Sequence, residues 1–277
     1  MSSSRLEVRK THKLWIGGAF VRSESGRYDR APTADGRTVN VPRASRKDVR
    51  DALAAARQAA APWAARTAYN RGQILYRAAE ALEARGEGLD VGRQELAASV
   101  DVLLHYAGWT DKLQPVLGGV NPVAAPFLSF SLPEPTGVVG VVAPDAPPLL
   151  GLVAELAPVL AAGNVAVAVL SESDPVPGLD LAEVLAVSDL PAGVVNLLSG
   201  RRVELSMALA AHRDLNAIVD AAGDRELAGE LDRLAAETIK RVRHGRCAET
   251  YEQAVADALE RLEAVSELKT AWHPVGA

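Results

Sequence analysis

Beyond Pro135, the chain alternates between short Val-rich runs and longer segments in which apolar residues recur at helical spacing. The short runs predict strands at 138–142, 165–170, 194–198 and 215–219. The longer segments predict helices at 149–161, 178–187, 203–211 and 225–238. Because strands and helices that alternate in this way form parallel sheets, residues 136–242 predict an α/β fold with a Rossmann-like parallel sheet and helices on both faces.

The first part of the chain predicts a helical layer. The residues that follow Ser45 are rich in Ala, Leu, Arg and Glu, and Ser45 itself stands where an N-cap is expected. Pro62 is expected to separate two helical runs, and a further helix is predicted over 90–114, with Pro115 as its end. We therefore assign residues 1–115 to an N-terminal helical layer of the same domain.

Two segments predict β-structure outside the sheet. Residues 116–135 combine turn signals, such as Gly118-Gly119, with a run of alternating apolar residues, a pattern typical of a β-hairpin. A linker helix is predicted within 243–265, and a strand within 266–277.

Composition and charge exclude several classes of protein. The chain has 277 residues, of which 48% are hydrophobic and 23% are charged, and its formal net charge is -5. Since no run of Lys and Arg stands out, a surface for nucleic acids or anionic membranes is not expected. The polar start, the interrupted apolar segments and the single cysteine predict a cytoplasmic protein. The five histidines lack ligand spacing, so no metal site is expected.

Six segments resemble the aldehyde dehydrogenase family and occur in that family's order, covering roughly residues 13–242. They are Leu14-Trp-Ile-Gly-Gly-Ala-Phe, Pro62-Trp-Ala, Tyr106-Ala-Gly-Trp-Thr-Asp-Lys-Leu-Gln, Glu134-Pro-Thr-Gly-Val-Val-Gly-Val-Val, Leu156-Ala-Pro-Val-Leu-Ala-Ala-Gly-Asn and Leu190-Pro-Ala-Gly-Val-Val-Asn-Leu-Leu-Ser-Gly. In addition, Ser266-Glu-Leu-Lys-Thr-Ala-Trp resembles the family's C-terminal strand. The resemblance implies the family's cofactor-type domain together with both pieces of its oligomerisation arm.

The chain departs from the family at its functional positions. The family's Pro-Trp-Asn-Phe-Pro supplies an asparagine for the developing oxyanion, but the matching stretch here contains Ala146, which has no donor. The family's Lys-Pro-Ser-Glu supplies a lysine for the cofactor ribose, but here Val169 takes its place. Ser171 and Glu172 remain from that motif. The resemblance therefore implies vestigial cofactor positions and no bound NAD(P).

The departures continue further along the chain. The family's Phe-Thr-Gly-Ser turn, which lies near the pyrophosphate, corresponds to the segment from Asp220 to Gly223, and the aspartate would repel a phosphate. Where the family has Glu-Leu-Gly-Gly-Lys, with the general-base glutamate, this chain has Arg243-His244-Gly245. The family's catalytic domain, with its nucleophilic cysteine, does not follow. The resemblance thus implies a chain without catalytic residues.

Two interpretations in which the chain keeps a catalytic role remain open. Cys247 lies in a stretch that faintly resembles the family's nucleophile motif, but it follows the preceding strand too closely, so a packed or exposed thiol at a helix end is expected. Asp145 and Asp220 both follow predicted strands and could act as paired carboxylates, although such residues serve more often as helix caps. His244 and Arg246 are expected in a solvated loop.

In the family, the arm crosses to extend the catalytic sheet of a partner subunit, and this chain retains the arm without that sheet. We therefore expect a non-catalytic subunit that joins a full-length aldehyde dehydrogenase paralogue in a hetero-oligomer, with the helix at 225–238 as a second contact. The expected interface residues are Phe127, Leu128, Phe130, Leu268, Lys269, Thr270 and Trp272. Two alternatives are a ligand-binding module that uses the vestigial nucleotide cleft and a divergent NAD(P)-dependent aldehyde oxidoreductase that uses Cys247.

Overall fold

A computed structural model describes residues 10–275 of the chain. The expected segments at 1–9 and 276–277 lie outside the described residues. A seven-stranded sheet forms the centre, in the order β11-β10-β7-β8-β9-β1-β2. Its strands are β1 (Leu14–Ile16), β2 (Ala19–Val21), β7 (Val138–Val142), β8 (Val165–Val169), β9 (Val195–Leu198), β10 (Ala217–Asp220) and β11 (Arg241–His244).

The five strands from β11 to β9 are parallel, as expected, whereas β1 joins β9 antiparallel through Trp15 and Leu197. Every residue of β7 and β8 is buried. Both faces of these strands must therefore be covered, which is why the sequence shows continuous Val-rich runs there instead of alternation.

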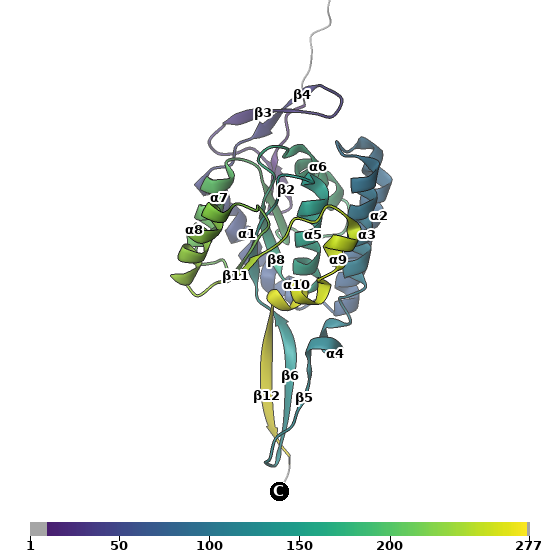
Figure 1. Ribbon diagram of the computed structural model, residues 1–277, viewed down its shortest axis with the longest axis vertical. Helices are drawn as coiled ribbons and strands as arrows, with labels where there is room; N and C mark the ends of the chain where they lie inside the picture. Colours follow the sequence, from purple (N-terminus) through teal and green to yellow (C-terminus); the bar gives the residue numbers. More distant parts are fainter. Residues whose placement is uncertain (1–9, 276–277) are drawn as a thin grey trace, which may run out of the picture.

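Helices cover the sheet in two layers, as Figure 1 shows. One face carries α1 (Arg46–Ala64), α7 (Arg202–Ala211) and α8 (Arg225–Ala236). The other face carries α5 (Pro148–Ala161) and α6 (Val176–Leu185), on which α2 (Ala68–Arg85) and α3 (Arg93–Ala107) pack as an outer layer. A short 3-10 helix, η1 (Gly86–Gly88), follows α2. The α/β class with helices on both faces is thus confirmed.

Helix α1 begins at a capping box. The Ser45 hydroxyl accepts hydrogen bonds from the N–H groups of Lys47 and Asp48, and the Asp48 carboxylate accepts one from the N–H of Ser45 at 2.8 Å. The predicted break at Pro62 is wrong, because α1 continues to Ala64. A proline in the last turn removes only one backbone hydrogen bond, so the helix tolerates it.

Two other expectations about the N-terminal layer need correction. The helix predicted over 90–114 ends at Ala107, and Pro115 lies inside the short helix α4 (Leu113–Leu117). Proline is accepted there because the first turn of a helix has no partner for its N–H groups. The layer is also not purely helical, since it includes β1, β2 and the hairpin of β3 (Tyr28–Pro32) with β4 (Thr38–Pro42).

The linker helix expected within 243–265 is two short helices, α9 (Tyr251–Val255) and α10 (Ala258–Ala264). They are separated at Asp257, whose backbone is not helical. Both helices pack on α5, and α9 also contacts α3. As a result, α5 is buried along nearly its whole length between the sheet and these helices.

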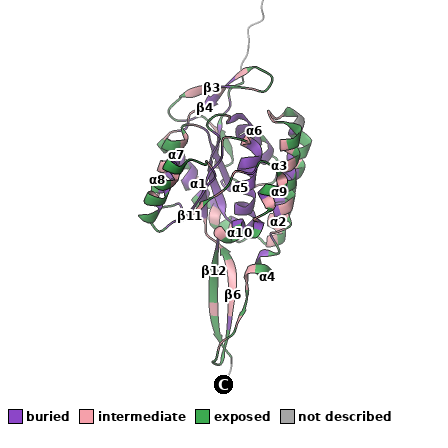
Figure 2. Ribbon diagram, in the orientation of Figure 1, coloured by how far each residue is buried: buried purple, intermediate pink, exposed green. Residues whose placement is uncertain are grey.

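The arm is a separate three-stranded sheet in the order β12-β6-β5. Strand β5 (Gly119–Asn121) and strand β6 (Phe127–Pro135) form the predicted hairpin. Strand β12 (Ser266–Pro274) pairs antiparallel with β6 along its full length, from Ser266 opposite Pro135 to Pro274 opposite Phe127. Figures 1 and 2 show that this sheet projects from the body and that most of its residues are exposed or half-buried.

Candidate functional site

Open α/β sheets bind ligands at the carboxyl ends of their parallel strands. At this edge of the sheet, the loops after β7, β8, β9 and β10 lie next to one another. In that order they carry Asp145 with Ala146, Ser171 with Glu172, Arg201 with Arg202, and Gly223. The fold therefore gathers at one edge the positions that the sequence marked as vestigial, and adds two arginines that the sequence analysis missed.

The Asp145 carboxylate is held from the neighbouring loop and from α7. Its Oδ1 accepts hydrogen bonds from the backbone N–H groups of Glu172 at 3.0 Å and Ser173 at 3.1 Å, and from the Ser171 hydroxyl at 3.1 Å. Arg202 donates to both carboxylate oxygens, over 2.9 and 2.5 Å. Burial would raise the pKa of Asp145, but these hydrogen bonds and the Arg202 charge hold it well below its usual range. Asp145 is therefore a charged residue with a structural role, because it links the loop after β7 to the loop after β8 and to α7.

Glu172, which the family's motif retains, is also engaged. One carboxylate oxygen accepts a hydrogen bond from Arg201 at 2.9 Å, and the other accepts one from the backbone N–H of Arg202 at 2.7 Å. Val169, which the resemblance places at the position of the family's lysine, is fully buried at the end of β8. This position is thus part of the core, and the Glu172 carboxylate is occupied by arginines of the same chain.

Carboxylates also cap the helices that begin at this edge. Glu95 accepts hydrogen bonds from the N–H groups of Leu149 and Leu150, the first free donors of α5. Asp224 accepts two from the first turn of α8, directly after Gly223, which has a φ of 74°. A phosphate at either N-terminus would meet a carboxylate where it needs free N–H donors.

Cys247 lies beside Ala146, which the resemblance places at the position of the family's asparagine, although sequence spacing did not predict this contact. Its Sγ donates a hydrogen bond to the carbonyl oxygen of Ala146 over 2.8 Å. Burial raises the pKa of the Cys247 thiol, and the nearby charges of Glu249 and Glu155 raise it further. A protonated thiol is a poor nucleophile, and the Ala146 side chain offers no donor to an oxyanion.

Asp145 and Asp220 do not act as a pair, because each has its own set of partners. Asp220 is 3% exposed, and its carboxylate contacts the N–H of Ala222 at 3.0 Å and Nδ1 of His244 at 3.2 Å. The expectation that His244 lies in a loop is wrong, since it is the last residue of β11 and its Nε2 contacts Asp232 on α8 at 2.9 Å. Arg246 does lie in an exposed loop.

Two hollows accompany these elements. A groove of about 370 Å³ lies between α7 and α8, near the carboxyl edge. It is lined by Val203, Met207, Leu227, Asp224, Glu226 and Glu230.

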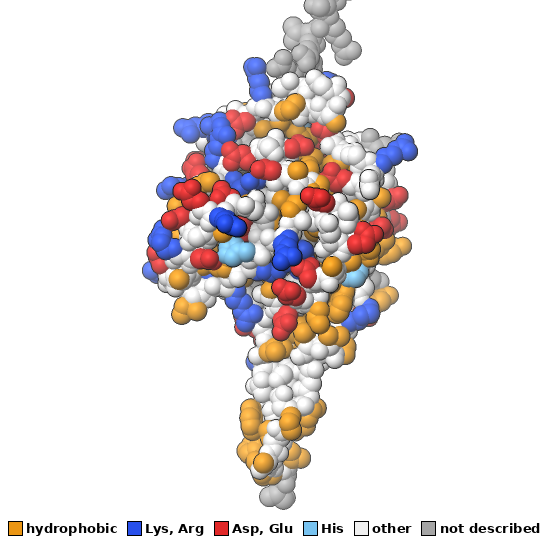
Figure 3. Space-filling view, viewed as in Figure 1, with side chains coloured by type: hydrophobic (Ala, Val, Ile, Leu, Met, Phe, Trp, Pro, Cys, Tyr) orange, Lys and Arg blue, Asp and Glu red, His pale blue; other side chains and the backbone are white. Residues whose placement is uncertain are grey.

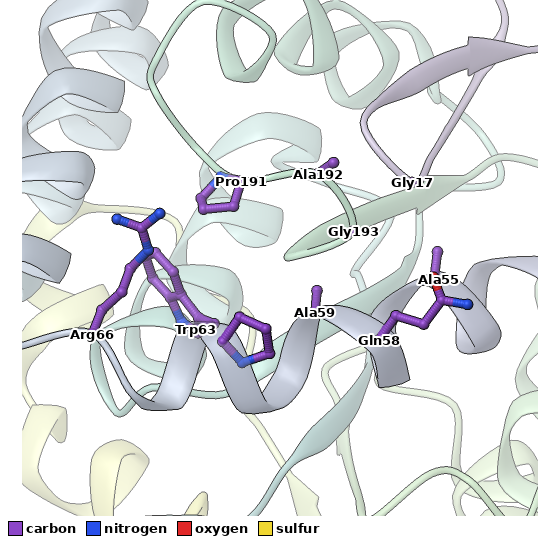
Figure 4. Close-up of a pocket in the computed structure, with 10 residues that line it drawn as sticks. Gly17, Ala55, Gln58, Ala59, Trp63, Arg66, Pro191, Ala192 and Gly193 are labelled. Carbon is purple, nitrogen blue, oxygen red and sulfur yellow. The ribbon is translucent and has the colours of Figure 1, made fainter.

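A hollow of about 250 Å³ lies at the opposite, amino edge of the sheet, where Pro191 and Ala192 face Ala59 and Trp63 of α1 (Figure 4). The residues that line this second hollow include no carboxylate, histidine or cysteine, so it offers no acid, base or nucleophile.

Residues 10–275 contain no cluster of three or more His, Cys, Asp or Glu side chains that could hold a metal ion. Within the same described part of the chain, no helix combines the length and the apolar character needed to cross a membrane.

The structure brings all the expected interface residues into the arm. Three of them lie on β6 and four on β12, which forms one edge of the three-stranded sheet. Figure 3 shows hydrophobic side chains gathered at the far end of the arm. Exposed apolar residues of the arm include Val120, Phe127, Leu128, Leu268, Trp272 and Val275.

The aldehyde dehydrogenase family profile matches residues 20–245. The chain is 30% identical over 258 residues to aldehyde dehydrogenase, cytosolic 1 of Macroscelides proboscideus, a match that covers 86% of this chain and 50% of that protein. It is 33% identical over 239 residues to human cytosolic 10-formyltetrahydrofolate dehydrogenase, covering 79% of this chain and 26% of that protein. The chain belongs to the aldehyde dehydrogenase family.

Solved structures agree with this assignment. The NAD+ complex of aldehyde dehydrogenase from Bacillus cereus superimposes with a TM-score of 0.77 at 28% identity, covering 84% of this chain and 50% of that one. The NAD-dependent aldehyde dehydrogenase from Sinorhizobium meliloti gives a TM-score of 0.78 at 27% identity, covering 87% and 51%. The chain thus spans about half the length of these aldehyde dehydrogenases.

Proposed function

We propose that this chain is a non-catalytic subunit that assembles with a full-length aldehyde dehydrogenase of the same organism. The observation that carries the proposal is the complete arm, in which nine residues of β12 pair with nine residues of β6. Residues 10–275 otherwise form the central sheet and the β3–β4 hairpin, so the described part of the chain has no second large sheet to receive a partner's arm. A full-length relative has the additional half in which such a sheet can lie.

The carboxyl edge supports the non-catalytic part of the proposal. The oxyanion donor is absent at Ala146, and the Cys247 thiol is held in its protonated form. A dinucleotide does not fit the side chains present, because Glu172 is occupied by arginines and both nearby helix N-termini carry carboxylate caps.

The two faces of the arm differ in character. Side chains alternate between faces along a strand, and directly opposite residues share a face. One face, which we call the polar face, carries hydrogen bonds from Asn121 to Ser131 at 3.0 Å and between Ser131 and Thr270 at 2.8 Å. At its far end, Phe127 packs edge-on against Trp272, with ring centroids 6.0 Å apart. The polar residues of this face satisfy one another within the arm, whereas Trp272 remains 60% exposed.

The other face, which we call the apolar face, has charged pairs only at its end nearest the body, where Lys269 contacts Glu134 at 3.0 Å and Glu267 contacts Arg241 at 2.7 Å. It carries Val120, Leu128, Phe130, Leu132 and Ala271 across three strands. Val120 is 72% exposed and Leu128 is 45% exposed, so this face leaves apolar surface open to solvent. Of the expected interface residues, Leu128 and Phe130 contribute direct contact on this face, whereas the exposed Leu268 and Trp272 lie on the polar face. Burial of this face by a partner is favourable by about 25 cal/mol per Å² of apolar area.

Mass photometry of the chain alone and after coexpression with each full-length aldehyde dehydrogenase of the organism tests the proposal. We expect a mixed oligomer of defined mass with one of them. Val120→Ser and Leu128→Ser should weaken it, while Val187→Ser, at an exposed valine outside the arm, serves as the matched control. Coexpression that yields only separate species with every paralogue would refute the proposal.

The groove between α7 and α8 favours a second candidate, a ligand-binding module. Its apolar residues Val203, Met207 and Leu227 suit a flat ring, but its three carboxylates disfavour phosphate. The prediction is therefore a thermal shift with uncharged adenosine and none with NAD+ or AMP. If adenosine at millimolar concentration leaves the melting temperature unchanged, this second candidate is excluded.

A further inference from the structure

Strand β12 forms an edge of the arm, and within residues 10–275 no strand pairs with its outer side. Its register with β6 is continuous from Ser266 to Pro274, so the strand is regular and has no bulge. A regular edge strand offers a row of free backbone N–H and C=O groups to another strand. The outer edge of β12 is therefore a surface on which strand pairing can continue.

Successive residues of β12 point their backbone groups alternately toward β6 and toward the outer edge. The carbonyl oxygen of Val265 accepts a hydrogen bond from the N–H of Thr136, directly after β6. The N–H of Val275 donates to the carbonyl oxygen of Pro126, directly before β6. Odd-numbered residues of β12 thus face β6. Away from the two ends of the strand, the residues that face the outer edge are Leu268, Thr270 and Trp272.

These three residues are spaced symmetrically about Thr270. When a second copy of β12 lies antiparallel with Thr270 opposite Thr270, Leu268 of each copy lies opposite Trp272 of the other. All three outward residues then exchange backbone hydrogen bonds. In the same register, Ser266 would lie opposite Pro274. The ladder would end there, because the Ser266 carbonyl oxygen already accepts a hydrogen bond from Arg241 and Pro274 has no N–H.

The side chains favour this register over its neighbours. Leu268 and Trp272 are 56% and 60% exposed, and the pairing would place them side by side on the polar face. Glu267 would lie opposite His273, which places an acceptor beside a ring that can donate. An axis on Lys269 would oppose two lysines, and an axis on Ala271 would place Leu268 opposite a proline without an N–H.

We propose that two copies of this chain pair through the outer edges of β12, as an antiparallel dimer with its two-fold axis at Thr270. The two arms then form one continuous six-stranded sheet. This inference goes beyond the proposed function, because it concerns the chain in the absence of a full-length partner. The contact is short, so we expect a dissociation constant on the order of 10 μM and rapid exchange, which leaves the arm accessible to a partner.

The test is sedimentation velocity of the chain alone, at concentrations from about 1 to about 100 μM. The wild-type chain should form a dimer at the upper end of this range. Thr270→Lys should weaken the dimer at least tenfold, because it places like charges directly opposite each other, and Thr270→Glu should do the same. An equimolar mixture of these two variants should restore the dimer, which also shows that both fold. Val120→Lys, at an exposed position on β5 at the other edge of the arm, is the matched control and should dimerise like the wild-type chain.

Three results would overturn the inference: a wild-type chain that remains monomeric at every concentration, a Thr270→Lys variant that dimerises as well as the wild type, or a mixture of the two charged variants that stays monomeric. None of these measurements includes a full-length aldehyde dehydrogenase, so their failure leaves the proposed function standing. Conversely, a chain that dimerises in this way but joins no paralogue on coexpression supports this inference and refutes the proposed assembly.

Discussion

Nη1 of Arg261 lies 2.6 Å from Oε1 of Glu155, and both side chains are only 2% exposed. The second carboxylate oxygen of Glu155 pairs with Arg243 at 2.8 Å, and Asp257 contacts both arginines. Glu155 lies on α5, Arg243 on β11 and Arg261 on α10. The segment that follows residue 245, where the family match ends, is therefore anchored in the core by a buried network of charges.

Removal of one member of this network should destabilise the fold strongly. Arg261→Met leaves Glu155 buried with a single cation, and breaking a buried ion pair typically costs about 3–5 kcal/mol. Arg233→Met, which breaks the exposed pairs of α8, should cost no more than about 1 kcal/mol. Urea unfolding of both variants measures the difference. Equal midpoints for the two variants would show that the network contributes little.

Ile239 has a left-handed backbone, with a φ of 55°, and is 93% exposed in the turn between α8 and β11. This conformation is unfavourable for a β-branched residue by about 1–2 kcal/mol, and glycine adopts it freely. Ile239→Gly should therefore raise the free energy of unfolding by about 0.5–1 kcal/mol after the larger chain entropy of glycine is subtracted. Ile239→Val, which keeps the strain, is the control and should change little. A destabilised glycine variant would contradict the strain argument.

His105, which contacts the Tyr251 hydroxyl of α9 through Nδ1 at 3.4 Å, should stabilise the docking of α9 only while it is neutral. Its Nε2 accepts a hydrogen bond from the Trp109 indole at 3.0 Å, and burial, together with the Lys112 charge, lowers its pKa. The unfolded chain binds a proton near pH 6.5, before the folded chain does, so this contribution is present above that pH and is lost as the pH falls through the lowered pKa.

The check compares the wild-type chain with His105→Leu by urea unfolding at about pH 7.5 and about pH 5.5. The gap in stability between the two proteins should be larger at the higher pH. His244 contributes with the opposite sign, because its raised pKa gives stability that is lost as the pH rises, but it is common to both proteins and cancels. A gap that widens at low pH would contradict the assignment of His105 as an acceptor.

Cys247 should react slowly with thiol reagents in the folded protein. Burial and nearby carboxylates raise its pKa, so at neutral pH it has less thiolate than an ordinary cysteine with a pKa of about 8.5. The rate of modification by an aromatic disulfide should increase when the chain is unfolded in urea. Cys247→Ala should leave any aldehyde oxidation of the mixed oligomer unchanged. Rapid modification of the folded chain, or loss of aldehyde oxidation in the variant, would contradict this prediction and support a catalytic role for Cys247.

Local patterns predicted much of the fold. The strands from β7 to β10 begin and end within two residues of their predicted limits, because Val-rich runs bounded by Gly, Pro and polar residues carry a strong local signal. The cap at Ser45 was predicted for the same reason. The helix ends predicted from Pro62 and Pro115 were wrong. The effect of a proline depends on its place within a helix, and the sequence alone does not fix that place.

The candidate site was less accessible to sequence reasoning. Ala146 and Val169 were identified through the resemblance, but the ties of Arg202 to Asp145 were missed. The only local signal is the pair Arg201-Arg202, two residues beyond the end of β9. Glu155 and Arg261 are 106 residues apart in the chain. An ion pair over that separation produces no periodic pattern in the sequence from which it could be predicted. Such contacts become visible only when the packing of α10 on α5 is known.

The arm is assembled from two segments that lie on either side of the five parallel strands in the chain, with β6 before β7 and β12 after β11. During synthesis on the ribosome, β6 emerges together with β5, but its other edge stays unpaired until the residues after Ser266 have left the exit tunnel. The central sheet can therefore be in place before the arm is complete. The arm is therefore complete only after the parallel strands and the helices between its two segments have been made, and under the proposed function a partner could be recruited through it only from that point on.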